Sequence, residues 1–234
     1  MIKESLDEVR SLIKKNAEAV GRKYEDITLI AVTKTHGADM INEAIRCGVT
    51  DIGENKVQEI LEKYDKVLPV RWHLIGHLQT NKVKYIIDKV CMIHSVDSVH
   101  LMDEIERQAQ KHGIESIDIL IEVNVSGEES KFGISPDELD SLLSHAEDLK
   151  HVKVKGLMTI LPKNCDNVTK TLLFNNINKV FIDNKTKTYH NVIMEKLSMG
   201  MSGDFEDAIR NGSNMVRIGS RIFGERKYNI KSEE

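Results

Sequence analysis

Short apolar runs alternate with amphipathic stretches along nearly the whole of this 234-residue chain, and this alternation limits the possible folds more than any other feature. A run that is apolar on both faces is typical of a strand in a parallel sheet, which is covered on both sides. The amphipathic stretches between such runs are typical of helices. The repeat therefore predicts an α/β fold built from βα units.

Eight apolar runs are candidates for strands. We expect strands at residues 28–32, 50–53, 72–75, 91–94, 117–125, 153–158, 193–198 and 215–218. We expect helices at residues 38–46, 57–64, 81–89, 98–111 and 205–210, from residue 135 onward, and within 164–191. A further helix at the N-terminus is indicated by apolar residues at three-to-four spacing, namely Ile2, Leu6, Val9, Ile13, Ala17 and Val20.

The number of strands favours a closed barrel. No linker rich in Pro, Gly or Ser separates them. A (β/α)8 TIM barrel takes roughly 200–250 residues, so one barrel with an extra N-terminal helix fits this length. An open doubly wound sheet is the alternative, but it usually has fewer strands at this length. We expect residues 1–234 to form a single TIM-barrel domain.

The charge balance and the cysteines exclude several classes of protein. A net charge of -4 and a pI near 6.2 lack the basic excess of a nucleic-acid-binding surface. The N-terminal stretch is charged throughout, and no apolar run reaches the length of a membrane span. Cys47, Cys91 and Cys165 are far apart and lack the spacing of a zinc site. We predict a cytoplasmic protein that binds neither nucleic acid nor membrane.

Lys34 follows the first predicted strand, in the run Val32-Thr33-Lys34-Thr35. Functional residues of such barrels lie where strands end. A partly desolvated amine at the barrel mouth can form a Schiff base with an aldehyde. A lone lysine more often extends to solvent from the rim. Lys34 is therefore a candidate only in combination with other features.

The second and third predicted strands end in polar side chains that have ordinary alternatives. Asn55 follows Gly53 and either offers a donor and an acceptor to a ligand or caps the next helix. His73 and His77 have no third ligand at a suitable spacing. We interpret both as histidines whose hydrogen bonds are satisfied within a strand or loop, and we predict no metal site.

Hydroxyls and glycines follow the seventh and eighth predicted strands. Residues 197–204 read LSMGMSGD, and residues 216–220 read VRIGS. TIM barrels commonly bind phosphate at these two loops with backbone N–H groups and hydroxyls. Gly and Ser also mark ordinary turns, but two such runs at the two expected places favour a phosphate site. Arg217 would reach the phosphate or a ring nitrogen, unless it is a salt-bridged residue of the barrel.

A candidate Schiff-base lysine and a phosphate site in one barrel together indicate a phosphorylated aldehyde as the ligand. Pyridoxal 5′-phosphate is the obvious cofactor of this kind.

Seven motifs follow one another along the chain. They read LIAVTKT, DIGENKVQE, WHLIGHLQTNK, IEVNVSGEESKFG, GLMTI, LSMGMSGDFEDAI and VRIGSRIFGER. From about residue 29 to residue 226 the sequence resembles the pyridoxal-phosphate homeostasis protein family, whose barrel is similar to the N-terminal domain of alanine racemases. The resemblance is specific because several long motifs occur in the order that the family has.

The resemblance implies a role for each polar residue at the barrel mouth. Lys34 would carry the cofactor, Asn55 would lie near its ring, and Arg217 would face the pyridine nitrogen. Met199 would pack against the site. The phosphate would be surrounded by Ser198, Ser202, Gly219 and Ser220. Residues 164–191 match the family least.

The same resemblance bears on whether the protein is an enzyme. An arginine beside the pyridine nitrogen keeps that nitrogen unprotonated, which weakens the ring as an electron sink. Racemisation requires an acid or base on each face of the substrate, and Lys34 is the evident candidate for one face. Alanine racemases resembling this fold still work with such an arginine. They also bring a second catalytic base, a tyrosine, from a second domain of a partner subunit, and we expect no such domain here.

We therefore expect a non-catalytic protein of intracellular vitamin B6 homeostasis, which holds the cofactor as a Schiff base on Lys34 and buffers it or delivers it to apo-enzymes. An amino-acid racemase that depends on pyridoxal phosphate is the alternative. A Schiff-base aldolase acting on a sugar phosphate is the third hypothesis. Without the dimer-forming domain of the racemases, we expect a monomer.

Overall fold

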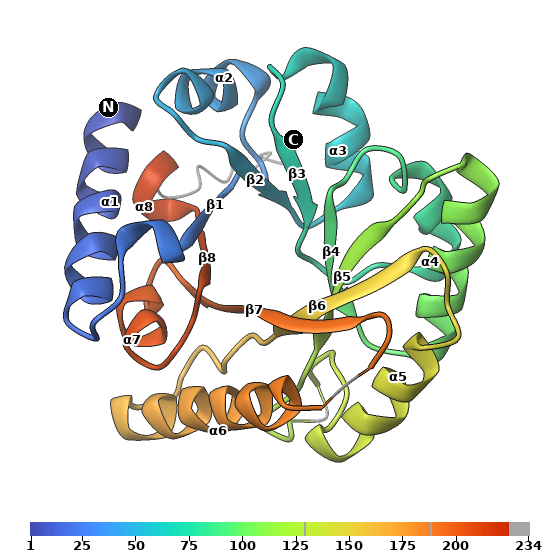
Figure 1. Ribbon diagram of the computed structural model, residues 1–234. Helices are drawn as coiled ribbons and strands as arrows, with labels where there is room; N and C mark the ends of the chain where they lie inside the picture. The colour runs from blue at the N-terminus through green and yellow to red at the C-terminus, as the bar shows by residue number, and fades with distance from the viewer. Residues whose placement is uncertain (129, 188, 225–234) are drawn as a thin grey trace, which may run out of the picture.

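Eight parallel strands close into a barrel in this computed structural model, which describes residues 1–128, 130–187 and 189–224 (Figure 1). Strands that follow one another in the sequence are neighbours in the barrel, and β8 pairs with β1 to close it. The strands are β1 (Thr28–Val32), β2 (Asp51–Glu54), β3 (Arg71–Leu74), β4 (Met92–Val96), β5 (Ile117–Glu122), β6 (Val152–Met158), β7 (Val192–Met201) and β8 (Met215–Ile218). The predicted (β/α)8 barrel is confirmed, and the open sheet is wrong.

Helices cover the outside of the barrel (Figure 1). The α-helices are α1 (Ile2–Glu18), α2 (Ala38–Arg46), α3 (Val57–Lys63), α4 (Val99–His112), α5 (Leu139–Ala146), α6 (Asn167–Lys185), α7 (Phe205–Arg210) and α8 (Ser220–Phe223). Short 3-10 helices occur at η1 (Tyr24–Asp26), η2 (Tyr64–Lys66), η3 (Thr80–Tyr85) and η4 (Pro136–Glu138). In the described part of the chain, no helix combines the length and the apolar character that crossing a membrane requires.

The predicted α-helix at residues 81–89 is wrong. The chain forms η3 there and then a turn. Val83, Ile86 and Ile87 are buried, which produced the apolar spacing of a helix. All three are β-branched, and such side chains lower helix propensity because they restrict the χ1 angle.

The ends of β5 and β7 each differ from the prediction by three residues, other strand bounds by one or two, and the helix α8 was not predicted. β5 ends at Glu122 instead of residue 125, because Asn124 Oδ1 accepts hydrogen bonds from Ser126 Oγ (2.9 Å) and Gly127 N (3.1 Å) and turns the chain. β7 continues beyond residue 198 to Met201. The four-residue helix α8 is too short to give a periodic apolar pattern.

The register of the strands gives the inside of the barrel an unusual mixture of side chains. A small apolar cluster there consists of Ile30, Met92, Leu120, Met158 and Met215, apart from the larger core between the sheet and the helices. Arg217 pairs with Ile30, His73 with Met92, and Ser198 with Met158 and Met215. Because paired residues of neighbouring strands face the same side of a sheet, these polar side chains point into the barrel.

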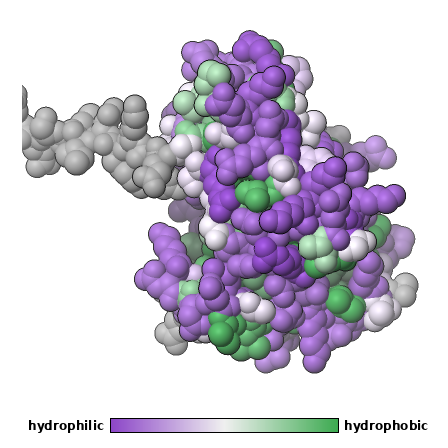
Figure 2. Space-filling model, turned by 90° about the vertical axis from the view of Figure 1, so that its left-hand side faces the viewer, coloured by the Kyte–Doolittle hydropathy of each residue, from purple (hydrophilic) through white to green (hydrophobic). Residues whose placement is uncertain are grey.

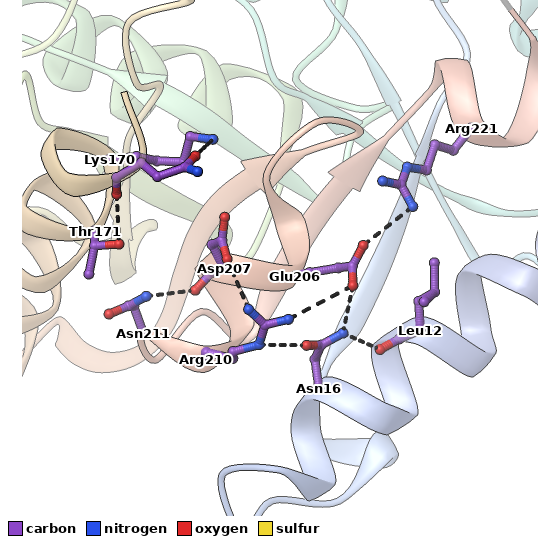
Figure 3. Close-up of polar contacts among 10 residues, drawn as sticks. Leu12, Asn16, Lys170, Thr171, Glu206, Asp207, Arg210, Asn211 and Arg221 are labelled. Carbon is purple, nitrogen blue, oxygen red and sulfur yellow. Dashed lines mark hydrogen bonds and ion pairs between the residues drawn. The ribbon is translucent and has the colours of Figure 1, made fainter. Parts of the chain in front are cut away.

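The N-terminal helix α1 packs beside α7 and α8 and is joined to them by polar contacts (Figures 1 and 3). The buried Asn16 donates through Nδ2 to Leu12 O (2.8 Å) and Glu206 Oε2 (3.2 Å), and its Oδ1 accepts from Arg210 Nε (2.7 Å). Glu206 Oε1 also accepts from Arg221 Nη1 of α8 (3.4 Å). The face of the molecule on the side of α1 is largely hydrophilic, with small separate apolar areas (Figure 2). The helix thus braces the two segments that follow β7 and β8.

Candidate functional site

A cavity of about 420 Å³ lies at the carboxyl end of the barrel. Its lining residues lie at or just beyond the ends of β1, β2, β3, β5, β6, β7 and β8. This is the end at which TIM barrels place their functional residues, and the volume is in the range of small-molecule sites. Of the residues predicted from the sequence, the structure brings together Lys34, Asn55, Ser202, Arg217, Gly219 and Ser220.

Lys34 lies two residues beyond β1 and forms part of the cavity wall, where it is partly buried. The next residue, Thr35, has a φ of 70°, which a β-branched residue rarely adopts. Strain of this kind persists only where the surrounding structure holds it, and it is concentrated at functional sites. Here Thr35 N donates to Glu59 Oε2 of α3 over 2.6 Å. The backbone at Lys34 is therefore fixed on its C-terminal side.

A buried polar network fixes the other side of Lys34. Lys63 Nζ donates to Thr33 O (3.0 Å), Glu54 Oε1 (2.8 Å) and Glu59 Oε2 (2.7 Å). Thr33 Oγ1 donates to Glu54 Oε1 over 2.7 Å. Burial raises the pKa of Glu54, although the bonds from Lys63 and Thr33 oppose that effect. The network ties the residue before Lys34 to β2 and α3.

Hydroxyls and glycines from two loops form one side of the cavity. Ser202 and Gly203 follow β7, and Gly219 and Ser220 follow β8. Gly219 N donates to Ser202 Oγ over 3.1 Å, which joins the two loops. This is the pair of loops at which the sequence predicts a phosphate site, and hydroxyls with backbone N–H groups are suitable donors to an anion.

Arg217 lies on the inward face of β8 and contributes to the cavity lining, although it is only 3% exposed. Its Nη1 donates to Ser198 Oγ (2.6 Å) and its Nη2 to Thr159 O (2.9 Å). Burial lowers the pKa of Arg217 to about 10, while the charges of Glu122 and Asp204 act in the opposite direction. The guanidinium is therefore cationic at neutral pH.

Ser198 and Met199 do not line the cavity. Both are fully buried in β7. Ser198 Oγ contacts Arg217 and His94, and Met199 belongs to the core between the sheet and the helices. Both residues are close to Ser202 in the sequence. Because side chains alternate along a strand, Ser198 faces the inside of the barrel and Met199 faces the helices, both below the cavity.

Glu122, at the end of β5, is a cavity residue that the sequence reasoning missed. It is 5% exposed. Burial and the charge of Asp97 raise the pKa of Glu122 to about 7, against the lowering effect of Arg217. The sequence signal was present: a charged residue in an apolar strand is costly without a partner, as at Lys34. Because the sequence predicts a strand that continues to residue 125, it does not indicate that a strand ends at Glu122.

Two ring-bearing residues, His77 and Phe132, belong to the cavity lining. His77 stacks on Phe132 with ring centroids 3.9 Å apart and an interplanar angle of 12°, and its Nδ1 lies 3.6 Å from Asp97 Oδ2. His73 lies inside the barrel, where its two ring nitrogens contact Asp51 and His94. The two histidines therefore do not share a site. His73 has the satisfied hydrogen bonds that the sequence analysis predicts, whereas the described contacts of His77 are the stacking on Phe132 and the longer approach to Asp97.

Together these groups suit a ligand with two different functional groups. The Lys34 amine can react with a carbonyl, while the loops after β7 and β8 can bind an anion such as a phosphate. Arg217 adds a buried cationic donor below them. The last sequence motif continues past Gly224, so its residues 225 and 226 lie outside the described residues.

Comparison with known proteins gives consistent results. The family model described as alanine racemase, N-terminal domain, matches residues 10–227. A curated protein of Aquifex aeolicus named pyridoxal phosphate homeostasis protein is 45% identical, over 96% of this chain and 98% of its own length. A protein of the same name from Escherichia coli is 37% identical, over 98% of this chain and 99% of its own length.

Solved structures agree with this result. PipY of Synechococcus elongatus PCC7942, solved with PLP bound, has a TM-score of 0.84 and 31% identity, and the match covers 96% of this chain and 100% of PipY. Alanine racemase from Corynebacterium glutamicum has a TM-score of 0.63 at 15% identity, over 98% of this chain and 63% of the racemase. The second match shows a shared barrel fold only.

Proposed function

The chain belongs to the pyridoxal phosphate homeostasis protein family, and we propose on this basis that it binds pyridoxal 5′-phosphate as a Schiff base on Lys34. One observation carries the proposal: Lys34, Ser202, Ser220 and Arg217 line a single cavity. The PLP-bound relative PipY supports it. In this function the protein buffers the cofactor inside the cell or delivers it to apo-enzymes, and does not use it in a dedicated reaction.

The donor set fits the cofactor, and each cavity residue has a proposed role. Lys34 holds the aldehyde end through Nζ, and Ser202, Gly219 and Ser220 hold the phosphate. Asn55 lies beside the ring, and Arg217 faces the pyridine nitrogen. Ser198 and Met199 lie below the cavity, so we assign them indirect roles. Ser198 acts through its bond to Arg217, and Met199 packs the strand that carries Ser202.

Arg217 limits how strongly the bound cofactor could draw electrons from a substrate. When bound, pyridoxal phosphate supplies an aldehyde and a ring that can accept electrons, most strongly when its nitrogen is protonated. Because the Arg217 side chain only donates hydrogen bonds and stays charged with a pKa of about 10, it gives that nitrogen no proton at neutral pH. The names of the curated relatives, homeostasis proteins and not enzymes, agree with this role.

The remaining features of the proposal concern the molecule as a whole. We propose that the chain acts as one domain, since one barrel accounts for the strands from β1 to β8. We also propose a monomer; the one face that Figure 2 shows, on the side of α1, is largely hydrophilic. A cytoplasmic location agrees with three cysteines that form no disulfide among themselves. The recipients of delivered cofactor would be apo-enzymes that depend on pyridoxal phosphate.

A titration with the cofactor tests the proposal. Pyridoxal phosphate is added to the wild type, to Lys34→Ala and to Lys56→Ala, and visible absorbance and free cofactor are measured. Lys56 is the matched control, because this exposed lysine follows Asn55 but does not line the cavity. We expect saturable binding with a new absorbance band in the wild type and Lys56→Ala, and neither in Lys34→Ala. Equal binding by Lys34→Ala would contradict the proposal.

The same samples separate the alternatives. Loaded protein is incubated with L- and D-amino acids, and the enantiomers are measured over time. We expect no racemisation beyond that caused by the same amount of free cofactor. Racemisation that scales with wild-type protein and is lost in Lys34→Ala would establish the racemase instead. A wild type that binds no cofactor would favour the aldolase.

A further inference from the structure

A continuous chain of hydrogen bonds crosses the inside of the barrel. Arg217 Nη1 contacts Ser198 Oγ over 2.6 Å, and Ser198 Oγ lies 3.1 Å from His94 Nδ1. His94 Nε2 lies 3.0 Å from His73 Nδ1, and His73 Nε2 lies 2.9 Å from Asp51 Oδ1. All five side chains are at most 3% exposed. They come from β8, β7, β4, β3 and β2 in that order, so the chain passes from strand to strand across the barrel.

The direction of the chain follows from its first member. A guanidinium has no acceptor, so Ser198 Oγ accepts from Arg217. Ser198 then has one hydrogen left, and His94 Nδ1 is its other contact. His94 Nδ1 must accept, which places the His94 proton on Nε2. That proton is donated to His73 Nδ1, so the His73 proton lies on Nε2 and is donated to Asp51.

The reverse arrangement leaves a group without a partner. If His73 were doubly protonated, its Nδ1 would donate to His94, and His94 would donate to Ser198. Ser198 Oγ would then accept twice, and its own hydrogen would have no acceptor among the contacts of the described residues. A buried donor without an acceptor is costly. Burial, with the charge of Arg217, also lowers the pKa of His94 well below its usual value, so its ring is neutral.

Asp51 ends the chain with a fixed negative charge. Burial would raise the pKa of Asp51, but hydrogen bonds from His73, Arg71 and Thr50 lower it to about 2. Arg71 Nη2 and Thr50 Oγ1 both donate to Asp51 Oδ2 over 2.7 Å, which leaves Oδ1 to His73. Cys91 Sγ also lies 3.5 Å from His73 Nε2, as a weak additional contact. Asp51 and Arg71 border a second cavity of about 330 Å³.

No carboxylate of the described residues forms an ion pair with Arg217 within 4.0 Å, although Arg217 is buried and charged. Its two described hydrogen-bond acceptors are a hydroxyl and a backbone carbonyl. Hydrogen bonds in a chain polarise one another, so a carboxylate at the far end makes the Ser198 oxygen a better acceptor. The chain therefore connects the guanidinium to a negative charge that it does not touch.

We propose that Asp51 is a positioning residue for Arg217, which it orients through His73, His94 and Ser198 across the inside of the barrel. The donor–acceptor direction of this hydrogen-bond chain is already set in the protein without ligand. The consequence for the ligand rests on the proposed function: the chain sets how firmly Arg217 is presented to the pyridine nitrogen, and Asp51 controls this from outside the cavity.

Asp51→Asn tests the direction of the chain. Arg71 and Thr50 are both able to donate, so the amide oxygen faces them and the amide NH2 group faces His73 Nε2. His73 must then accept at Nε2, and the protons of both rings move to Nδ1, although this leaves the Ser198 hydrogen without an acceptor among the described contacts. A buried Asp→Asn change that reverses a histidine tautomer is known in serine proteases. Asp118→Asn is the matched control, since this β5 carboxylate has no described bond to the chain.

The tautomers are measured by nitrogen-15 NMR of histidine-labelled protein without cofactor, with His73→Gln and His94→Gln to assign the signals. We expect Nε2–H on both rings in the wild type and in Asp118→Asn, and Nδ1–H on both in Asp51→Asn. Nδ1–H on His94 in the wild type, or no change in Asp51→Asn, would overturn the proposal. If Asp51→Asn does not fold, the wild-type tautomers decide the direction of the hydrogen-bond chain. The cofactor affinity of Ser198→Ala then decides whether the chain positions Arg217.

Cofactor binding supplies the second measurement. We expect Asp51→Asn and Ser198→Ala each to weaken affinity by about 10-fold, the lower end of what loss of an outer partner causes at metal sites. We also expect both to shift the absorbance band in the same direction, with Asp118→Asn unchanged. Wild-type affinity and an unshifted band in both variants would contradict the positioning role. If the wild type binds no cofactor, the proposed function fails, while the NMR result still decides the direction of the chain.

Discussion

At the scale of single residues, the account depends on how a lysine is presented at the end of an apolar strand. The position of Lys34 is fixed by hydrogen bonds of its two neighbours to α3. Thr33 O accepts from Lys63, and Thr35 N donates to Glu59. The unfavourable φ of Thr35 indicates that this hold is strong enough to support strain.

Removing the centre of this network should be costly. Lys63→Met leaves Glu54 and Glu59 without their shared cation, and loss of one partner of a buried ion pair costs about 3–5 kcal/mol. We expect a loss of that size in the free energy of unfolding, measured with urea, together with weaker cofactor binding. The exposed Lys66→Met serves as control and should change neither quantity. An unchanged stability of Lys63→Met would show that the network does not hold the loop.

Glu122 should make stability depend on pH. Its pKa of about 7 in the folded protein lies above its ordinary value of 4.5, so protonation favours the folded state. This contribution is fully present below pH 4.5 and is lost as the pH rises through about 7, which amounts to about 3 kcal/mol. Asp97 and Arg217 are the charged groups that act on it.

Unfolding in urea at a series of pH values tests this expectation. Glu122→Gln should remove the decline in stability across that range, because a glutamine stays neutral. Glu115→Gln, a change at an exposed site before the start of β5, should keep the wild-type pH dependence. If wild type and Glu122→Gln lose stability in parallel, the carboxyl of Glu122 is not protonated in the folded protein.

At the scale of elements, α1 contacts α7 and α8 (Figure 3). These contacts support the loops after β7 and β8, where we propose that the phosphate binds. Asn16→Ala removes three hydrogen bonds and leaves Arg210 and Glu206 with fewer partners. We expect a loss of about 2 kcal/mol in the free energy of unfolding. We expect cofactor affinity to fall only in part. Lys15→Ala on the exposed face of α1 is the control. A full loss of affinity at unchanged stability would contradict this supporting role.

The elements also show how far the sequence determines the fold. The strands of a parallel barrel are apolar on both faces, so their positions could be predicted, and β1 and β8 match the expected bounds. The helix at residues 81–89 could not be judged from apolar spacing, because Val83, Ile86 and Ile87 give the same pattern in a 3-10 helix and turn.

The candidate site was predictable where its residues follow strand ends, as at Lys34, Ser202 and Gly219. Glu122 was lost because the turn at Asn124 shortens β5, which local hydrogen bonds decide. The chain from Arg217 to Asp51 could not be predicted, because strand register brings its members together. His94 and Ser198, for example, are 104 positions apart in the sequence.

At the scale of the whole molecule, cofactor binding should stabilise the fold because the cavity draws on seven of the strands. A ligand at 100 times its Kd stabilises by about 2.7 kcal/mol. For a chain of this length that corresponds to a rise of roughly 5–10 °C in Tm. Thermal unfolding should show this rise in the wild type and in Lys56→Ala, but not in Lys34→Ala. An equal rise in all three proteins would place the binding elsewhere.

Covalent mapping of the cofactor tests the central claim most directly. The protein is mixed with pyridoxal phosphate, reduced with borohydride so that a Schiff base becomes a stable bond, and digested for peptide mass analysis. We predict one dominant adduct at Lys34 in the wild type, lost without replacement in Lys34→Ala. An adduct mainly on another lysine, or equal labelling of the two proteins, would contradict the assignment of Lys34 as the residue that holds the cofactor.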